Sequence, residues 1–281
     1  MKHTKQISLL LLVITGVVLS CEKKDYKLGS LPDKSEINME VKQDFTVDSG
    51  GNTVYLINHT DKVEPIWDYA TGKSMRRVDT VRYAFKGDYK IARSAITSGG
   101  IVYLDTITIH VTKDNLNYVS DPLWIALSGG PGNEKVWMLD LDANGISKSF
   151  DGPVYFSGDE LRWGGGCANP GGNCWTWFPK WSDNTWICPK GDYGTMTFSL
   201  RGGPYVKVDQ KMISNSGVFN GTYYLDKDAK TISFSGVTPL NIGWDQIFSK
   251  GWLITLTDKT MQIGFKHPTK SEFEIYNYIS Q

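Results

Sequence analysis

Hydrophobic and polar residues alternate along much of the chain in short runs that end at turn residues. Glycine-rich turns, such as those at 49–51 and 98–100, separate the first group of runs. An alternation with a period of two is typical of strands that bury one face, and strands at this spacing favour a small β-sandwich. The pattern predicts strands at 38–41, 53–57, 78–85, 89–95 and 101–111.

The alternation resumes at about residue 117 and continues to the end of the chain. Its runs are again short and are separated by turns rich in glycine, proline, aspartate and asparagine. So many short strands fit a larger β-sandwich or jelly roll. We therefore expect an all-β protein with two domains, 36–115 and 116–281. Strands of the second domain are predicted at 123–127, 136–140, 196–200, 205–209, 221–225, 231–235, 252–257, 261–265 and 272–279.

The first twenty residues have the pattern of a signal peptide. A short basic head containing Lys2 and Lys5 precedes an apolar run at 7–19, which is too short to be an ordinary membrane-spanning helix. The run ends in Val18-Leu19-Ser20-Cys21, which resembles the lipobox of bacterial lipoproteins. We expect a signal peptide at 1–20, a lipid anchor on Cys21 and a polar tether at 21–35. The alternative is a plain secretory signal that is cleaved near Ser20.

Charge and cysteine content exclude several classes of protein. The formal net charge is zero at pH 7, and loss of the signal peptide removes two lysines, so a clustered basic face for nucleic acid is not expected. Cys167, Cys174 and Cys188 remain in the body of the chain. They favour either one disulfide with a leftover thiol or three reduced thiols. Zinc is less favoured because no histidine lies near them in the sequence, and we expect neither a metal nor a cofactor.

The segment 157–193 interrupts the rhythm of strands and is unusually aromatic. Five of the ten tryptophans lie in it, among glycine, asparagine and aspartate residues. A long loop of this kind is functional or disordered, and its aromatic content argues against disorder. Indole rings stack on the apolar face of a pyranose, while amides and carboxylates bind its hydroxyl groups. The stacking candidates are Trp163, Trp175, Trp177, Trp181 and Trp186, and the polar candidates are Asn173, Asp183 and Asn184.

An alternative is that these tryptophans form a small core that orders the loop, and we expect about half of them to be buried in that way. A third possibility is a structural or protein-interaction lipoprotein in which the tryptophans are core residues.

Catalysis is not favoured by the carboxylates. A glycosidase needs two carboxylates across a cleft, and no Glu-x-Asp-x-x-Glu run is present. The adjacent pair Asp159-Glu160 would point to opposite faces of a strand. Asp140, Asp142 and Asn144 have the alternating spacing of a calcium loop but lack the glutamate that completes one, so a solvated turn is favoured. We predict a non-enzyme; the rival is a carbohydrate hydrolase or lyase that uses Asp159, Glu160 or Asp183.

A motif in the first domain resembles a polycystic-kidney-disease (PKD) domain. The motif consists of Trp67-Asp68-Tyr69-Ala70-Thr71-Gly72, then Tyr83, then Gly87-Asp88-Tyr89. The resemblance implies an immunoglobulin-like sandwich in which Trp67 and Tyr89 pack in the core, and a domain that acts as a spacer.

The whole chain resembles the surface glycan-binding lipoproteins that Bacteroidetes encode in polysaccharide-utilisation loci. The resemblance rests on the signal, the tether and the PKD-like domain together with motifs in four segments of the second domain. These segments are 136–140, 192–198, 252–257 and 261–264. It implies a lipid-anchored protein on the surface of the outer membrane that captures a polysaccharide, with a β-glucan such as laminarin as the first choice. The implied partners are an outer-membrane glycan transporter and its lipoprotein lid.

Overall fold

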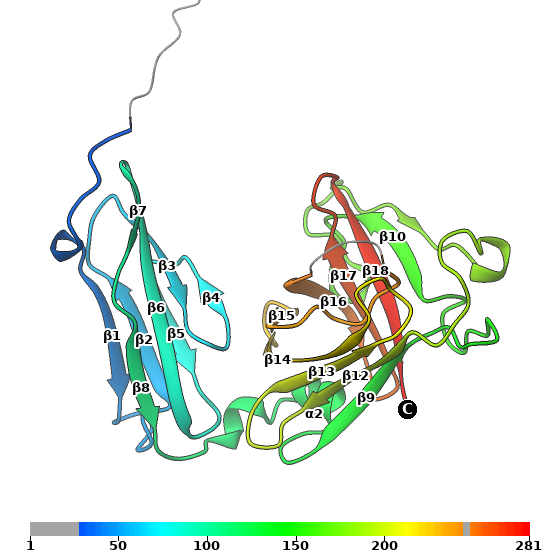
Figure 1. Ribbon diagram of the computed structural model, residues 1–281, viewed down its shortest axis with the longest axis horizontal. Helices are drawn as coiled ribbons and strands as arrows, with labels where there is room; N and C mark the ends of the chain where they lie inside the picture. The colour runs from blue at the N-terminus through cyan, green and yellow to red at the C-terminus, as the bar shows by residue number, and fades with distance from the viewer. Residues whose placement is uncertain (1–27, 244–247) are drawn as a thin grey trace, which may run out of the picture.

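The computed structural model describes residues 28–243 and 248–281 (Figure 1). The predicted signal peptide, Cys21 and the first part of the predicted tether, 21–27, lie outside this range. The described chain is all-β, as the alternation predicts, apart from one short helix and several 3-10 turns. None of its helices is both long and apolar enough to cross a bilayer.

The N-terminal strands form two antiparallel sheets, which we call the N-terminal sheets. One has the order β1-β2-β5; the other has the order β4-β3-β6-β7, and β8 pairs with the first half of β6. The strands are β1 (Met39–Asp44), β2 (Thr53–Asn58), β3 (Glu64–Asp68), β4 (Lys73–Ser74), β5 (Val78–Arg82), β6 (Gly87–Thr97), β7 (Gly100–Tyr103) and β8 (Ile107–Val111).

One hydrophobic core lies between these two sheets. Val54 and Leu56 alternate inward from β2, and Trp67 of β3 is fully buried while its Nε1 donates to the carbonyl of Arg76. Tyr83 is buried and stacks on the half-buried Tyr89 with ring centroids 3.9 Å apart. Trp67 therefore packs inside this core, and Tyr89 packs against it.

The segment 123–127, which we predicted as a strand, is helical. A 3-10 turn η2 (Leu116–Val119) and the helix α2 (Pro122–Ser128) connect the N-terminal sheets to the rest of the chain. Asp121 caps α2 by accepting from the Leu123 amide, Pro122 occupies its first turn, and Gly129 ends it at φ 82°. A short apolar run does not distinguish a buried strand from a helix, so these flanking residues decide the structure.

The C-terminal strands form a closed eight-stranded barrel rather than the expected sandwich or jelly roll. Each strand is antiparallel to the next along the chain, and β18 pairs with β9 to close the sheet. Alternation shows which face of a strand is buried but not which strand lies beside it, which is why the sequence pattern did not distinguish the two folds. The barrel strands are β9 (Glu134–Leu139), β12 (Gly194–Ser199), β13 (Tyr205–Gln210), β14 (Gly217–Asp226), β15 (Thr231–Ser235), β16 (Lys250–Leu256), β17 (Thr260–Lys266) and β18 (Glu272–Ser280).

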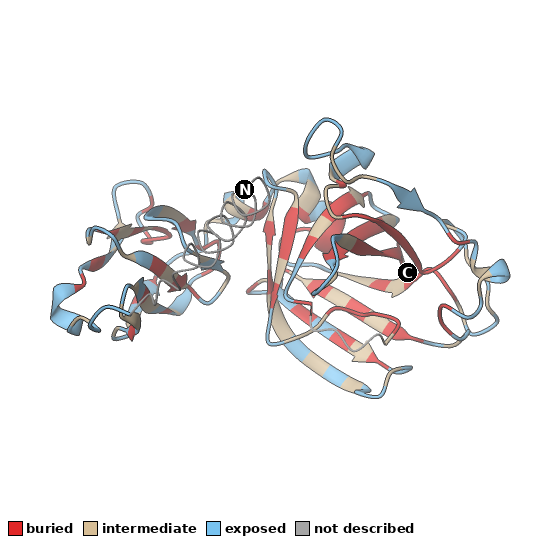
Figure 2. Cartoon of the chain, turned by 90° about the horizontal axis from the view of Figure 1, so that it is seen from above, coloured by how far each residue is buried: buried red, intermediate tan, exposed pale blue. Residues whose placement is uncertain are grey.

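Large side chains fill the barrel. Trp137, Phe198, Tyr223, Phe265 and Tyr276 are almost completely buried in its main core. Buried residues alternate with half-buried or exposed ones along β12 and β13, whereas nearly every residue of β17 and β18 is buried (Figure 2). Closure leaves the eight barrel strands themselves without a free edge.

Two further strands extend the sheet outside the barrel. The C-terminal end of β18 pairs with β9, whereas its first half pairs with β10 (Val154–Gly158). The short β11 (Thr176–Trp177) then adds to the outer edge of β10. The segment that contains the five tryptophans runs from β10 to β12, on the side of the barrel away from the N-terminal sheets (Figure 1).

Candidate functional site

A disulfide between Cys167 and Cys174 staples the first part of the aromatic loop, residues 159–193. It closes the glycine-rich turn 168–173, and Cys167 also forms a backbone bridge with Leu161. Cys188 is buried and has a free thiol. Of the two sequence-based alternatives, the structure therefore has one disulfide with a leftover cysteine.

A small core beneath the loop fixes it to the outer wall of the barrel. Tyr155, Leu161 and Phe273 are buried there together with residues of β16 and β18. Arg162 lies over the rings of Trp252 and Phe273, at 5.7 Å from each ring centroid. The loop is therefore an ordered part of the fold.

Three aromatic rings stack at the outer edge of the sheet, and we call them the aromatic ladder. Phe156 of β10 stacks on Trp177 of β11 at 5.4 Å, and Trp177 stacks on Trp186 at 6.2 Å, with interplanar angles of 24° and 23°. Phe156 is buried, Trp177 is 44% exposed and Trp186 is 71% exposed. The ladder therefore rises from the core to a tryptophan pair that is open to solvent.

More aromatic surface lies next to the ladder. Trp175 is 46% exposed and precedes Trp177 by two residues, which is the spacing of side chains on one face of an extended segment. Phe178 is 64% exposed and stacks on Tyr155 at 4.4 Å. The sequence interpretation missed Phe156 and Phe178, although the adjacent pair Tyr155-Phe156 on a strand was a signal for rings on both faces.

Trp181 has a different role from Trp177 and Trp186. It is half-buried against the main core, and its Nε1 donates to the carbonyl of Cys188 at 3.0 Å. A Cβ atom at Gly145 would come within 2.6 Å of its ring, so the 140–152 segment packs closely on it. Although the sequence made it a stacking candidate, Trp181 anchors the loop.

Trp163 faces a lysine and not the ladder. It lies in the turn η3 (Trp163–Gly165), is 37% exposed, and has the Lys230 ammonium 5.3 Å from its ring centroid.

Four of the five loop tryptophans are more than a third exposed. Fewer of them are therefore buried than the half that we expected.

The polar candidates mainly hold the loop together. The Asn173 amide donates to Asp159 at 3.1 Å and to the carbonyl of Ser271. The Asn184 amide donates to the carbonyl of Lys180 at 3.0 Å. Asp183 is exposed and accepts from the neighbouring Ser182 hydroxyl at 3.0 Å. Of the three, Asp183 is the side chain best placed to contact a ligand.

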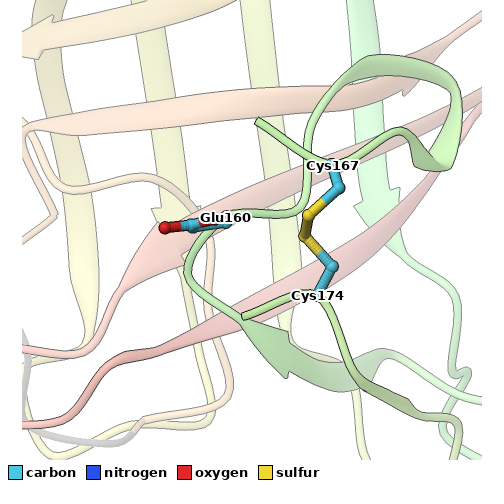
Figure 3. A group of neighbouring side chains, drawn as sticks. All are labelled: Glu160, Cys167 and Cys174. Atoms are coloured by element: carbon cyan, nitrogen blue, oxygen red, sulfur yellow. A yellow bond between two sulfur atoms is a disulfide. The ribbon is translucent and has the colours of Figure 1, made fainter. Parts of the chain in front are cut away.

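The two adjacent carboxylates near the disulfide have different surroundings. Asp159 forms an ion pair with Lys266 at 2.9 Å, and hydrogen bonds from Lys266 and Asn173 hold the pKa of the Asp159 carboxyl below its usual range. Glu160 lies beside the disulfide (Figure 3), with Oε2 buried and lacking a hydrogen-bond partner within the described chain. Cys167 and Cys174 lie close enough to share a metal with it, but disulfide sulfurs lack the thiolate charge that binds metals.

The Asp159–Lys266 pair should make the loop sensitive to acid. Because the folded-state pKa of Asp159 is lowered, its contribution to stability is present above the unfolded pKa of about 4 and is lost as the pH falls below that value. We expect Asp159→Asn to reduce the loss of thermal stability between pH 5 and pH 3. Melting temperatures of both proteins across this range test this, and parallel curves would contradict it.

Loss of the disulfide should loosen the loop without unfolding the barrel. A disulfide that closes a short loop contributes about 2–3 kcal/mol by restricting the open state. We expect amides at 161–175 to exchange at least tenfold faster in the Cys167→Ala, Cys174→Ala double variant. Cys188→Ala is the control for removal of a sulfur. Equal exchange in wild type and the double variant would show that packing alone orders the loop.

Neither comparison with known proteins assigns a family. No family model matches the chain, and no curated protein matches it. The function must therefore be inferred from the geometry of the molecule.

Proposed function

We propose that this protein is a non-catalytic glycan-binding lipoprotein, and that the exposed end of the aromatic ladder is its sugar-binding platform. The observation that carries the proposal is the Trp177–Trp186 pair, stacked at 6.2 Å with both rings open to solvent. The apolar C–H face of a pyranose stacks on such a ring, and the edge of the sugar stays accessible to polar groups such as Asp183.

The rigidity of the loop supports binding and not a purely structural role. Exposed aromatic surface is unfavourable unless it has a use, and this loop keeps five rings exposed, four tryptophans and Phe178, although its disulfide and anchors order the chain around them. A platform that is ordered before the ligand arrives loses little conformational entropy on binding. Exposed and fixed rings are therefore well suited to stacking on a weakly polar sugar face.

The state of the nearby carboxylates supports capture without cleavage. Asp159 is paired with Lys266 and its pKa is lowered, which is the opposite of what a general acid needs. The buried Oε2 of Glu160 lies against Gly172 and not on an open face. Neither residue has the environment of a glycosidase carboxylate.

The remaining parts fit a protein that displays this platform at a cell surface. We propose that Cys21 carries the lipid anchor in the outer membrane and that 21–35 is a tether. The N-terminal sheets then form a PKD-like β-sandwich spacer. An outer-membrane glycan transporter and its lipoprotein lid are the proposed partners, and a β-glucan such as laminarin is the proposed ligand.

Affinity electrophoresis tests this function. The soluble 22–281 chain is run through gels that contain laminarin, other β-glucans, α-glucans, mannan or xylan. We expect retardation by at least one polysaccharide and no release of reducing ends on incubation. Migration that every polysaccharide leaves unchanged would overturn the proposal, and release of sugars would favour the enzymatic rival.

A further inference from the structure

A cleft of about 340 Å³ lies between the N-terminal sheets and the barrel. The aromatic loop lies on the opposite side of the barrel (Figure 1). The end of β5, the connecting segment with η2 and α2, and the end of β14 form its walls. Its volume is within the range of small-molecule sites, which occur preferentially between domains. The residues that carry the argument are Arg82, Tyr118, Asp121, Tyr224 and Asp226.

The cleft has fixed walls because the two sides share packing and a hydrogen-bond network. Ala84 and Phe85, which follow β5, pack in the main core of the barrel together with Trp124 of α2. On the other side, Asp48 accepts hydrogen bonds from Thr53 and Asn115 and from the hydroxyl of Tyr118. These bonds orient the connecting segment, and with it the Tyr118 ring, against the N-terminal sheets.

Two hydrogen-bond donors in the cleft have no partner. The Arg82 guanidinium lies 5.8 Å from the centroid of the Tyr118 ring, yet it forms no hydrogen bond or ion pair within the described chain. The Tyr224 hydroxyl likewise has no hydrogen bond there, while its ring meets Trp124 edge-on at 6.3 Å. Arginine offers five donors in a planar fork. A guanidinium whose donors have no partner, next to an aromatic ring, is therefore well suited to bind the acceptor groups of a ligand.

Two acceptors face the same space. Asp121 uses Oδ1 to cap α2, and Asp226 uses Oδ1 to accept two amides of its own turn. In each residue the second carboxylate oxygen accepts no hydrogen bond within the described chain and is left to accept from a ligand. Arg82 and Lys227 offset the carboxylates of Asp121, Asp226 and Asp228, so the cleft does not select a strongly charged ligand.

We propose that this cleft is a second saccharide-binding site. Each hydroxyl of a sugar both donates and accepts a hydrogen bond, which matches free donors on Arg82 and Tyr224 placed with free acceptors on Asp121 and Asp226. The rings of Tyr118 and Tyr224 supply the apolar contact. The choice of a saccharide over another neutral polyhydroxyl ligand rests on the proposed function of the aromatic ladder.

A second site would change how the protein holds a polymer. One polysaccharide chain could contact both the cleft, which lies between the N-terminal sheets and the barrel, and the ladder, which lies on the side of the barrel away from those sheets. When both contacts engage one chain, the second becomes intramolecular and raises the apparent affinity without new contacts. A long glycan should then bind more tightly than any oligosaccharide that reaches one site alone.

Isothermal titration calorimetry of the 22–281 chain with oligosaccharides from the same glycan panel tests the cleft. The starting protein is the Trp177→Ala, Trp186→Ala variant, which lacks the exposed ladder. We expect it to keep one binding event, and we expect Arg82→Met or Tyr224→Phe on this background to weaken that event on the order of tenfold. Arg77→Met is the matched control, because Arg77 directly precedes β5 and lies at the opposite end of that strand from Arg82. This substitution should change the affinity of the remaining binding event less than twofold.

The outcomes separate the two proposals. Wild-type binding that disappears completely in the ladder variant overturns the cleft and leaves the proposed function intact. Residual binding that neither Arg82→Met nor Tyr224→Phe weakens also overturns the cleft. Absence of sugar binding by wild type overturns both proposals. Tyr224→Phe removes one oxygen atom, so it remains informative if Arg82→Met does not fold.

Discussion

Replacing Trp177 and Trp186 together by alanine is expected to weaken glycan binding at the ladder on the order of a hundredfold. A tryptophan at the centre of a binding surface contributes about 2 kcal/mol or more when it is truncated, and each 1.4 kcal/mol is a factor of ten. The two rings stack on each other, so their effects should not add fully. Affinity electrophoresis and calorimetry of the double variant measure the loss.

The matched control for this variant is Tyr103→Ala. Tyr103 is 67% exposed on β7 of the N-terminal sheets, so its removal deletes a similar aromatic surface away from the ladder. Its binding should stay within twofold of wild type. Equal binding by the ladder variant and wild type would show that the exposed tryptophans are not the platform.

Asp140→Ala is expected to cause the largest loss of stability of any single substitution considered, about 3 kcal/mol or more. The Asp140 carboxylate is completely buried at the end of β9. It accepts from the Ser147 hydroxyl and from the amides of residues 148, 149 and 150, at 2.6–2.9 Å. Alanine would leave these partly buried donors without their acceptor and release the 141–152 segment. Urea unfolding followed by fluorescence measures the change.

The same substitution should reach the aromatic loop. The 141–152 segment packs against Trp181 through Gly145 and Gly152, and the carbonyl of Asp151 accepts from the Trp181 amide at 2.8 Å. Asp142→Ala is the control, because this neighbouring carboxylate is less buried and accepts from amides of its own turn, including those of Asn144 and Ile146. A loss for Asp142→Ala as large as that for Asp140→Ala would contradict the proposed role of the Asp140 carboxylate in holding the 141–152 segment.

The alternation of residues predicted most of the strands but not their arrangement. The period of two identifies a buried face, so Val54 and Leu56, or Val206 and Val208, could be placed inward from sequence alone. Barrel closure depends on the pairing of β18 with β9, about 140 residues apart, and no local signal encodes such a contact. Helix α2 was misread because its apolar run was given more weight than Asp121, Pro122 and Gly129.

The candidate site was predicted as a region but not as a geometry. Tryptophan density located the loop, yet only the fold distinguishes the exposed Trp186 from the anchoring Trp181. Asn173 and Asn184 were reasonable ligand contacts by residue type, but their amides are used within the loop. The cleft could not be predicted, because Arg82, Tyr118 and Tyr224 come together only when the N-terminal sheets meet the barrel.

Oxidation of tryptophan by N-bromosuccinimide, mapped by mass spectrometry with and without a bound polysaccharide, tests the central claim most directly. Trp177 and Trp186 are exposed and should react in the free protein, whereas the buried Trp67 and Trp137 should not. In a complex with the polysaccharide that retards the protein in gels, Trp177 and Trp186 should be protected at least tenfold, and Trp163 should react nearly as before. Saturating polysaccharide that leaves Trp177 and Trp186 as reactive as in the free protein would contradict the account.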